Sequence, residues 1–282
     1  MIGDALALLA AAGFGVSDFA GGIAARRVPA LRVVLVSYPV AFVLLGGFAV
    51  GVGGTISPGA IGWGLASGVA LGLGGWWFYA ALGSGPISVV SPVSAVLTAG
   101  VPVAIGVMIQ GDRPGPVAAS GIVLALLAVA LVSREATDED VRPHRFTRKV
   151  AWLTVGAGVM FGLDFVFIHE APADSGLWPL AFARAAAAVL VLAAAAGAGE
   201  LRLPSGGPMK LAVLAGLADT GSNVAMLLAL RGSDLALASV LISLFPAVTV
   251  VLAIVVLRER VHRGQLVGMA AAVVSVVMIT VG

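Results

Sequence analysis

Ten long apolar segments constrain the fold of this chain more than any other feature of its sequence. Crossing the roughly 30 Å hydrocarbon layer of a membrane takes about 20 apolar residues in a helix, and each segment comes close to this length. A helix also pairs its own backbone groups, as lipid requires. The segments are residues 3–25, 31–52, 60–82, 87–109, 116–133, 150–168, 177–197, 209–230, 235–257 and 265–281. We therefore predict an all-α integral membrane protein with ten transmembrane helices.

The composition excludes an ordinary soluble protein. Of the 282 residues, 60% are hydrophobic and 11% are charged, whereas about a quarter of the residues in a soluble domain are charged. The basic residues stand between the apolar segments, where they orient helices rather than bind nucleic acid. Cysteine is absent, which excludes disulfides and cysteine metal sites. The predicted partner is the lipid bilayer, and the predicted location is the cell membrane.

One polar stretch divides the chain into two halves. Residues 134–149 combine many charges with few apolar side chains, which is typical of a linker. Five apolar segments precede this stretch and five follow it. We predict a first five-helix repeat in residues 1–133, a polar linker in residues 134–149 and a second five-helix repeat in residues 150–282.

The two halves resemble each other. A shift of about 147 residues superposes short motifs of the first half on those of the second. Because each half crosses the membrane an odd number of times, the second copy enters from the opposite side, which predicts two inverted repeats. The superposed pairs are Phe14-Gly15 and Phe161-Gly162, Gly68 and Gly216, Ala81-Leu82 and Ala229-Leu230, Ser91 and Ser239, Asp112 and Glu259, and Gly121 and Gly268.

The basic residues gather on one side of the predicted membrane. Loops after the first, third, fifth, seventh and ninth segments hold thirteen arginines and lysines, against two, Arg113 and Arg231, in the other loops. Positively charged loops stay in the cytoplasm. On charge alone, both termini of the chain would lie outside.

Four ionisable residues fall well within the apolar segments, namely Asp18, Asp164, Arg184 and Asp219. A charge that faces lipid at the centre of a bilayer costs about 2.5–3.5 kcal/mol. These side chains are therefore expected to face a polar interior. The alternative for Asp18 and Arg184 is a position near a helix end, from which a side chain can reach the membrane surface or pair structurally.

Several polar residues recur at helical spacing and share faces with one another. Such faces could line one polar cavity and contact a substrate, and Asp219 is the strongest candidate. The alternative is hydrogen bonding between helices by small polar residues, which is common in membranes. The three faces carry Asp219, Ser222, Asn223 and Met226; Ser91, Ser94 and Thr98; and Ser239 and Ser243.

The third segment combines glycines with aromatic residues. Gly64, Gly68 and Gly72 recur every four residues, which allows close contact with another helix. Trp76 and Tyr79 follow them. An aromatic belt at the membrane surface explains these two most simply, and stacking on a substrate is the alternative.

Prolines interrupt two other segments. Pro92 and Pro102 lie in the fourth and Pro246 lies near the middle of the ninth. Each removes a backbone hydrogen bond and can kink its helix, and interruptions in two inverted halves indicate a binding site at the membrane midplane. No histidine or carboxylate cluster has metal-ligand spacing, so we expect no metal and no cofactor.

The end of the chain carries the motifs that identify a family. The whole chain resembles the EamA-like members of the drug/metabolite transporter superfamily, with ten segments, two repeats and Phe-Gly early in each half. The first half departs from the pattern, with Asp112-Arg113 where the second half has Glu259-Arg260. The closing motif consists of Ser239, Pro246, Leu257-Arg258-Glu259-Arg260 and Gln265-Leu266-Val267-Gly268.

The resemblance implies a basket of helices around a central cavity, lined mainly by the first, third, fourth, sixth, eighth and ninth helices. It implies alternating-access export or uptake of amino acids and related small metabolites. Members usually have cytoplasmic termini, which conflicts with the charge count, so the orientation stays open.

We therefore predict a secondary active transporter of small metabolites, most plausibly an amino-acid exporter, with a proton as candidate coupling ion and with no enzymatic activity. Asp219, Asn223 and Ser222 would anchor the substrate, and Asp18 and Asp164 would bind a proton or a substrate amine. A passive channel is the alternative. A remote alternative is an intramembrane aspartyl protease that uses Asp164 and Asp219, because residues 216–219 approach the Gly-x-Gly-Asp signature of such enzymes.

Overall fold

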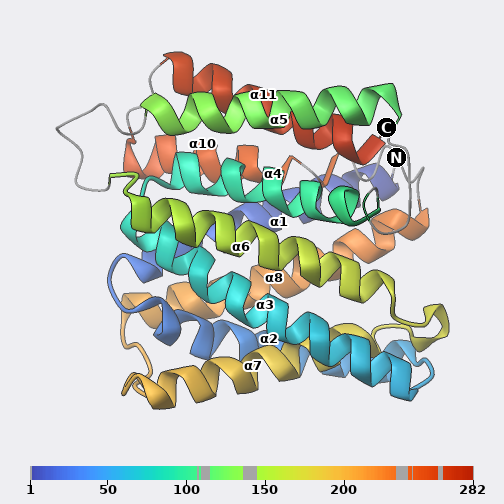
Figure 1. The fold of residues 1–282 in the computed structure, drawn as a ribbon. Coiled ribbons are helices and arrows are strands. Elements are labelled where there is room, and N and C mark those ends of the chain that lie inside the picture. The colour runs from blue at the N-terminus through green and yellow to red at the C-terminus, as the bar shows by residue number, and fades with distance from the viewer. Residues whose placement is uncertain are drawn as a thin grey trace.

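The computed structural model of the chain is a bundle of helices (Figure 1). It describes residues 2–106, 108, 115–135, 145–232, 241–242, 244–259 and 263–281. The helices run side by side, and α1 begins at the end of the bundle where α11 finishes. The α-helices of the described residues are α1 (Ile2–Ala25), α2 (Ala30–Val52), α3 (Pro58–Ser84), α4 (Ile87–Ile105), α5 (Pro116–Glu135), α6 (Arg148–His169), α7 (Trp178–Gly197), α8 (Gly207–Gly232), α10 (Phe245–Leu257) and α11 (Arg263–Val281), with a short 3₁₀ turn, η2 (Ala173–Ser175), between α6 and α7.

Six of the described helices, α1, α2, α3, α4, α6 and α7, are long and apolar enough to cross a membrane by length and composition. At 1.5 Å per residue they reach the roughly 30 Å that a hydrocarbon layer requires. The chain is therefore an integral, multi-pass membrane protein. The predicted linker at residues 134–149 lies largely outside the described residues.

Side-chain caps and prolines decide where several helices begin. The Ser57 side chain accepts a hydrogen bond of 3.1 Å from the backbone N–H of Ala60, and Pro58 occupies the first turn of α3. Thr147 caps α6 in the same way through the N–H of Val150. These are the residue types that satisfy the free N–H groups of a first helical turn.

The ninth apolar segment differs from its prediction. Pro246 lies in the first turn of α10, not near the middle of a long helix, because residue 244 forms a turn and α10 starts at Phe245. A proline in a first turn breaks no helical hydrogen bond. Pro92 and Pro102, in contrast, lie inside α4 as expected.

The prediction of close helix contact by the α3 glycines is confirmed. A Cβ atom added to Gly64 would lie 2.8 Å from Cβ of Phe182, and one added to Gly68 would lie 2.6 Å from Cβ of Ala186. Gly72 meets the same helix, α7, at Leu190. The absence of a side chain at these positions lets the backbones of α3 and α7 approach each other.

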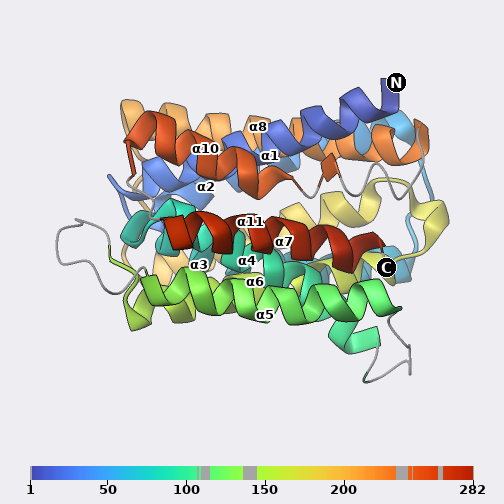
Figure 2. The ribbon, with the colours of Figure 1, turned by 90° about the horizontal axis from the view of Figure 1, so that it is seen from above.

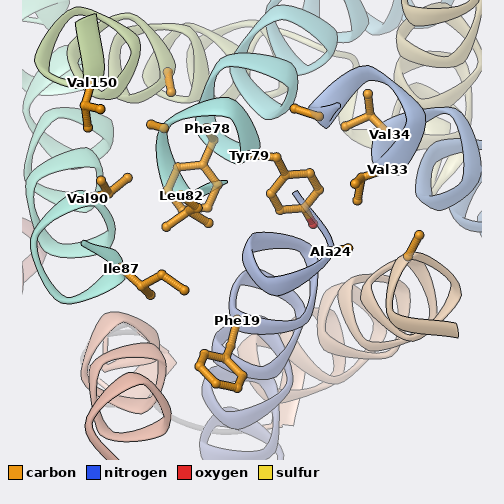
Figure 3. Packing of buried hydrophobic residues seen from close by; sticks show 14 of the residues in the cluster. Phe19, Ala24, Val33, Val34, Phe78, Tyr79, Leu82, Ile87, Val90 and Val150 are labelled. Carbon is orange, nitrogen blue, oxygen red and sulfur yellow. The ribbon is translucent and has the colours of Figure 1, made fainter. Parts of the chain in front are cut away.

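The helices of the two halves interlock. In the first half α1 packs against α8 of the second, while α3 packs against both α6 and α7. The pair α5 and α11 lies together at one edge of the bundle, as both views show (Figures 1 and 2). Most of the interior forms one apolar cluster, in which Tyr79 of α3 lies toward Val33 and Val34 of α2 (Figure 3).

Candidate functional site

A buried cavity of about 60 Å³ lies among α1, α2 and α3 of the first half and α6, α7 and α8 of the second. This volume has room for a few water-sized groups. Its wall combines charged, hydroxyl and aromatic side chains, unlike the apolar cluster around it. The lining residues are Ser17, Asp18, Ser37, Tyr38, Leu71, Gly75, Phe78, Tyr79, Phe161, Arg184, Ala215, Gly216 and Asp219.

An ion pair crosses one side of this cavity. Nη2 of Arg184, on α7, lies 2.7 Å from Oδ2 of Asp219, on α8. Arg184 is 7% exposed, although it carries a full charge. A buried charge persists only where a partner compensates it. The pair therefore holds a guanidinium group within the membrane-spanning part of the protein.

Asp18, on α1, faces the same cavity without such a partner. Among the described residues, none donates a hydrogen bond to its buried Oδ2 atom. The hydroxyl of Ser37, on α2, lines the cavity as well and has no partner within the described part of the chain. Unpaired polar atoms are costly when buried, so they indicate groups that a proton or a ligand completes.

Asp164, on α6, does not line the cavity. Its Oδ1 atom accepts a hydrogen bond from the hydroxyl of Ser67 on α3. It is also within electrostatic range of Arg184. Asp164 and Asp219 thus bind different partners, which does not fit the two carboxyl groups sharing a proton in an aspartyl protease.

Both tyrosines of the chain line the cavity. The Tyr38 hydroxyl donates a hydrogen bond of 2.8 Å to the backbone oxygen of Leu71, and the guanidinium carbon of Arg184 lies 5.9 Å from the centre of the Tyr38 ring. Gly75 makes room for the Tyr38 hydroxyl. The aromatic face therefore helps to hold Arg184 in place, through a cation–π contact.

Tyr79 lies deeper in the bundle than an aromatic belt allows. It is buried, at 8% exposure, and its ring packs against Gly21 of α1 (Figure 3). The expectation of a surface belt is therefore wrong for Tyr79. Trp76 packs against the apolar cluster and does not line the cavity.

The predicted polar faces separate in space. The cavity wall includes Asp219 but neither Ser222 nor Asn223. The Ser222 side chain instead faces Gly13 of α1 and donates to the backbone oxygen of Ala218 at 2.7 Å. Asn223 donates to the backbone oxygen of Asp219 at 2.8 Å. Both hydrogen bonds stay within α8, so they are not the bonds between helices that the alternative expected.

The serines of α4 also lie away from the cavity. Ser91 and Ser94 are buried but do not line it, and Ser239 lies outside the described residues. The family resemblance implied that the fourth and ninth helices would help to line the cavity. In the structure, α2 and α7 contribute described lining residues instead.

Sequence reasoning missed most of the second helix of each half. Ser37 and Tyr38 of α2 and Arg184 of α7 meet in the cavity, yet only Arg184 stood out, as a charge, and it was not placed in a binding site. The rarity of tyrosine, with two residues in the chain, was a usable signal. The sequence carried no usable signal for the pairing of Arg184 with Asp219, because this pairing depends on how α7 and α8 are rotated about their axes.

A second, larger groove of about 300 Å³ lies on the outer surface between α2 and α7. All its lining residues are apolar, and Val189 and Leu192 are more than half exposed. Its described lining offers no polar side chain to a polar solute. No group of three or more histidines or carboxylates in the described residues could hold a metal ion.

Comparisons with known proteins agree with this architecture. No curated protein matches the chain. Among 23 matching chains of solved structures, one described as "Crystal structure of protein" covers 96% of this chain and 98% of its own length, with a TM-score of 0.61 and 14% identity. At that identity the likeness shows the fold alone.

The model of the EamA-like transporter family matches the chain twice, over residues 1–134 and 148–281. Together the two matches cover nearly the whole sequence. The chain therefore belongs to the EamA-like transporter family and is a membrane transporter of the drug/metabolite type.

Proposed function

We propose that this chain is a secondary active transporter of the cell membrane that exports small polar metabolites, first of all amino acids, by alternating access. The carrying observation is the buried cavity between the halves, where Asp18 has an unpaired carboxylate oxygen beside the Arg184–Asp219 pair. A zwitterion offers one positive and one negative group to such a wall. When no substrate is bound, a proton on Asp18 would neutralise its unpaired carboxylate oxygen. A proton is therefore the candidate coupling ion.

The proposal includes two inverted five-helix repeats, with residues 1–133 and 150–282 as the repeating units. Support comes from the pairwise contacts: α1 packs against α8 and α3 packs against α6, and exchanging the halves converts one pair into the other. The loops agree. Arg32 of α2 pairs with Glu200 after α7 at 2.7 Å, while the N–H of Thr55 after α2 donates to the backbone oxygen of Asp174 before α7 at 2.9 Å.

The repeat can be tested with single cysteines, because the chain has none of its own. Arg27 and Asp174 occupy equivalent positions in the two halves and are both exposed. In an inverted repeat, Arg27→Cys and Asp174→Cys react with a membrane-impermeant thiol reagent from opposite sides. Leu203→Cys serves as a second probe of the Arg27 side, and Ile56→Cys of the Asp174 side. Labelling of Arg27→Cys and Asp174→Cys from the same side would contradict the inverted arrangement.

The transport proposal is tested by counterflow of labelled amino acids into proteoliposomes, with and without an imposed pH gradient. We expect saturable exchange. Flux that rises in proportion to concentration without a limit would instead favour a passive channel.

Asp18→Asn is expected to reduce exchange roughly tenfold or more. A hydrogen bond to a charged group contributes about 1.5–3 kcal/mol, and 1.4 kcal/mol corresponds to a factor of ten. The matched control is Asp174→Asn, which removes an exposed carboxylate outside the cavity and should leave exchange unchanged. Equal activity in both variants would remove Asp18 from the pathway.

Conformational change is proposed to involve α4, where Pro92 and Pro102 interrupt the helical hydrogen bonds. In the second half of the chain, the turn at residue 244 precedes Pro246 and the start of α10. Breaks of this kind allow one part of a helix to move against another.

A further inference from the structure

Among the described residues, one guanidinium group lines the cavity, and that group already binds a carboxylate of the protein itself. Arg184 lies 2.7 Å from Asp219. We propose that Asp219 holds the place of a substrate carboxylate on Arg184, and that a substrate binds by displacing it, so that Arg184 selects solutes with a free carboxylate. This inference rests on the proposed function and deepens it, because it names the selecting residue and the chemical group that is selected.

The two partners of the ion pair differ in burial. The Arg184 side chain is 9% exposed and that of Asp219 is 25% exposed. The Tyr38 ring lies beside the guanidinium group, with its centre 5.9 Å from the guanidinium carbon. Arg184 is therefore the more enclosed partner, while the more exposed Asp219 has more freedom to turn away. An exchange of partners on Arg184 would move the aspartate and leave the arginine in position.

The exchange keeps the positive charge of Arg184 paired with a carboxylate. A guanidinium group presents five N–H donors in a planar fork that matches any carboxylate. Replacing the Asp219 carboxylate by another carboxylate leaves Arg184 compensated throughout, so no uncompensated arginine charge is left buried. Asp219 is then released into the cavity and needs a positive partner.

An α-amino acid supplies that partner. Its ammonium group would lie between the released Asp219 and Asp18, whose Oδ2 atom accepts no hydrogen bond from the described residues. A plain amine could not displace Asp219, and a carboxylate without an ammonium group would leave two aspartates unpaired. The site therefore rejects a plain amine and a plain carboxylate, because each leaves polar groups of the complex unsatisfied.

The test compares the amino acid that exchanges best in the wild type with its α-amide, which keeps the ammonium group and the side chain but lacks the carboxylate. The variants are Asp219→Asn, Arg184→Gln and the double variant. In the wild type the acid should half-saturate at a concentration at least tenfold lower than the amide. Asp219→Asn removes the competing carboxylate and leaves Asp18 to bind the ammonium group, so the half-saturating concentration of the acid should fall by roughly tenfold, whereas that of the amide should not fall.

Arg184→Gln should abolish the preference for the acid over the amide, and in the double variant the gain from Asp219→Asn should disappear, since it depends on Arg184. Arg32→Gln removes an arginine that pairs outside the cavity and should keep the wild-type preference. The amount of monodisperse protein is compared for each variant, so that poor folding is separated from altered selection.

Two results would overturn the inference. Weaker binding of the acid in Asp219→Asn, in well-folded protein, would show that Asp219 acts mainly as a ligand of the substrate and not as a competitor for Arg184. A preference for the acid that persists in Arg184→Gln would place selection elsewhere. Either result leaves the proposed transport function standing, whereas the absence of saturable exchange for every amino acid in the wild type would overturn both.

Discussion

Replacing Gly68 with alanine is expected to destabilise the protein by about 3 kcal/mol, at the upper end of the cost of overpacking a well-packed interior. The added Cβ atom would lie 2.6 Å from Cβ of Ala186 and 3.0 Å from the carbonyl carbon of Ala183. Neither atom belongs to a flexible side chain end, so α3 and α7 must move apart. Denaturant-induced unfolding in detergent micelles measures the change.

A matched control lies six residues earlier on the same helix. Apart from the backbone of the same helix and the two neighbours of Gly62 in the chain, no described atom lies within 4 Å of the position that a Cβ would take at Gly62. Gly62→Ala should therefore be neutral or slightly stabilising, because alanine favours the helix over glycine by up to about 1 kcal/mol. Equal stability of the two variants would contradict the tight packing of α3 on α7.

The same contact bears on the candidate site. Gly68 meets Ala183, the residue directly before Arg184. The depth at which α7 packs on α3 therefore sets where the guanidinium group stands relative to Asp219. In Gly68→Ala we expect selection between acid and amide to weaken along with stability.

The second large effect concerns Glu259, after the end of α10. One carboxylate oxygen lies 2.7 Å from Nη2 of Arg26, which follows α1, and accepts from the N–H of Ile87 at 3.3 Å; the other accepts from the N–H of Ser88 at 3.2 Å. Glu259 thus caps α4 and ties three parts of the chain at one end of the bundle. A carboxylate also suits the positive end of a helix.

Glu259→Ala should destabilise the protein by about 2–3 kcal/mol, since hydrogen bonds to a charged group are the strong ones and Arg26 loses its partner in a half-buried place. Thermal unfolding of the purified protein measures this loss. Glu200→Ala is the comparison, because the Glu200–Arg32 pair has the same length of 2.7 Å but is more exposed, at 29% and 25% against 15% for both Glu259 and Arg26.

Exposed ion pairs contribute under about 1 kcal/mol, so Glu200→Ala should have the smaller effect. A loss in Glu259→Ala no larger than that in Glu200→Ala would mean that the cap on α4 contributes little. The sequence signalled this position through its motif, residues 257–260, but not the task that Glu259 performs.

Hydrophobic length and charge determined much of this protein before any coordinates. Single apolar segments of about 20 residues cross lipid as helices. The spacing of the α3 glycines predicted a close contact with another helix, which is α7 in the structure. The four charges inside those segments were expected to face a polar interior, and three of them, Asp18, Arg184 and Asp219, line the cavity, whereas Asp164 does not. These inferences hold because each depends on local composition and on the cost of exposing a polar group to lipid.

Only the tertiary structure decided which polar residues share the cavity. Ser222 and Asp219 lie three residues apart on α8, yet one packs on Gly13 of α1 and the other binds Arg184. Spacing along a helix shows which residues share a face, but not which neighbour that face meets. The rotation and partner of each helix arise from the packing of the whole bundle, and so do the inward place of Tyr79 and the turn before Pro246.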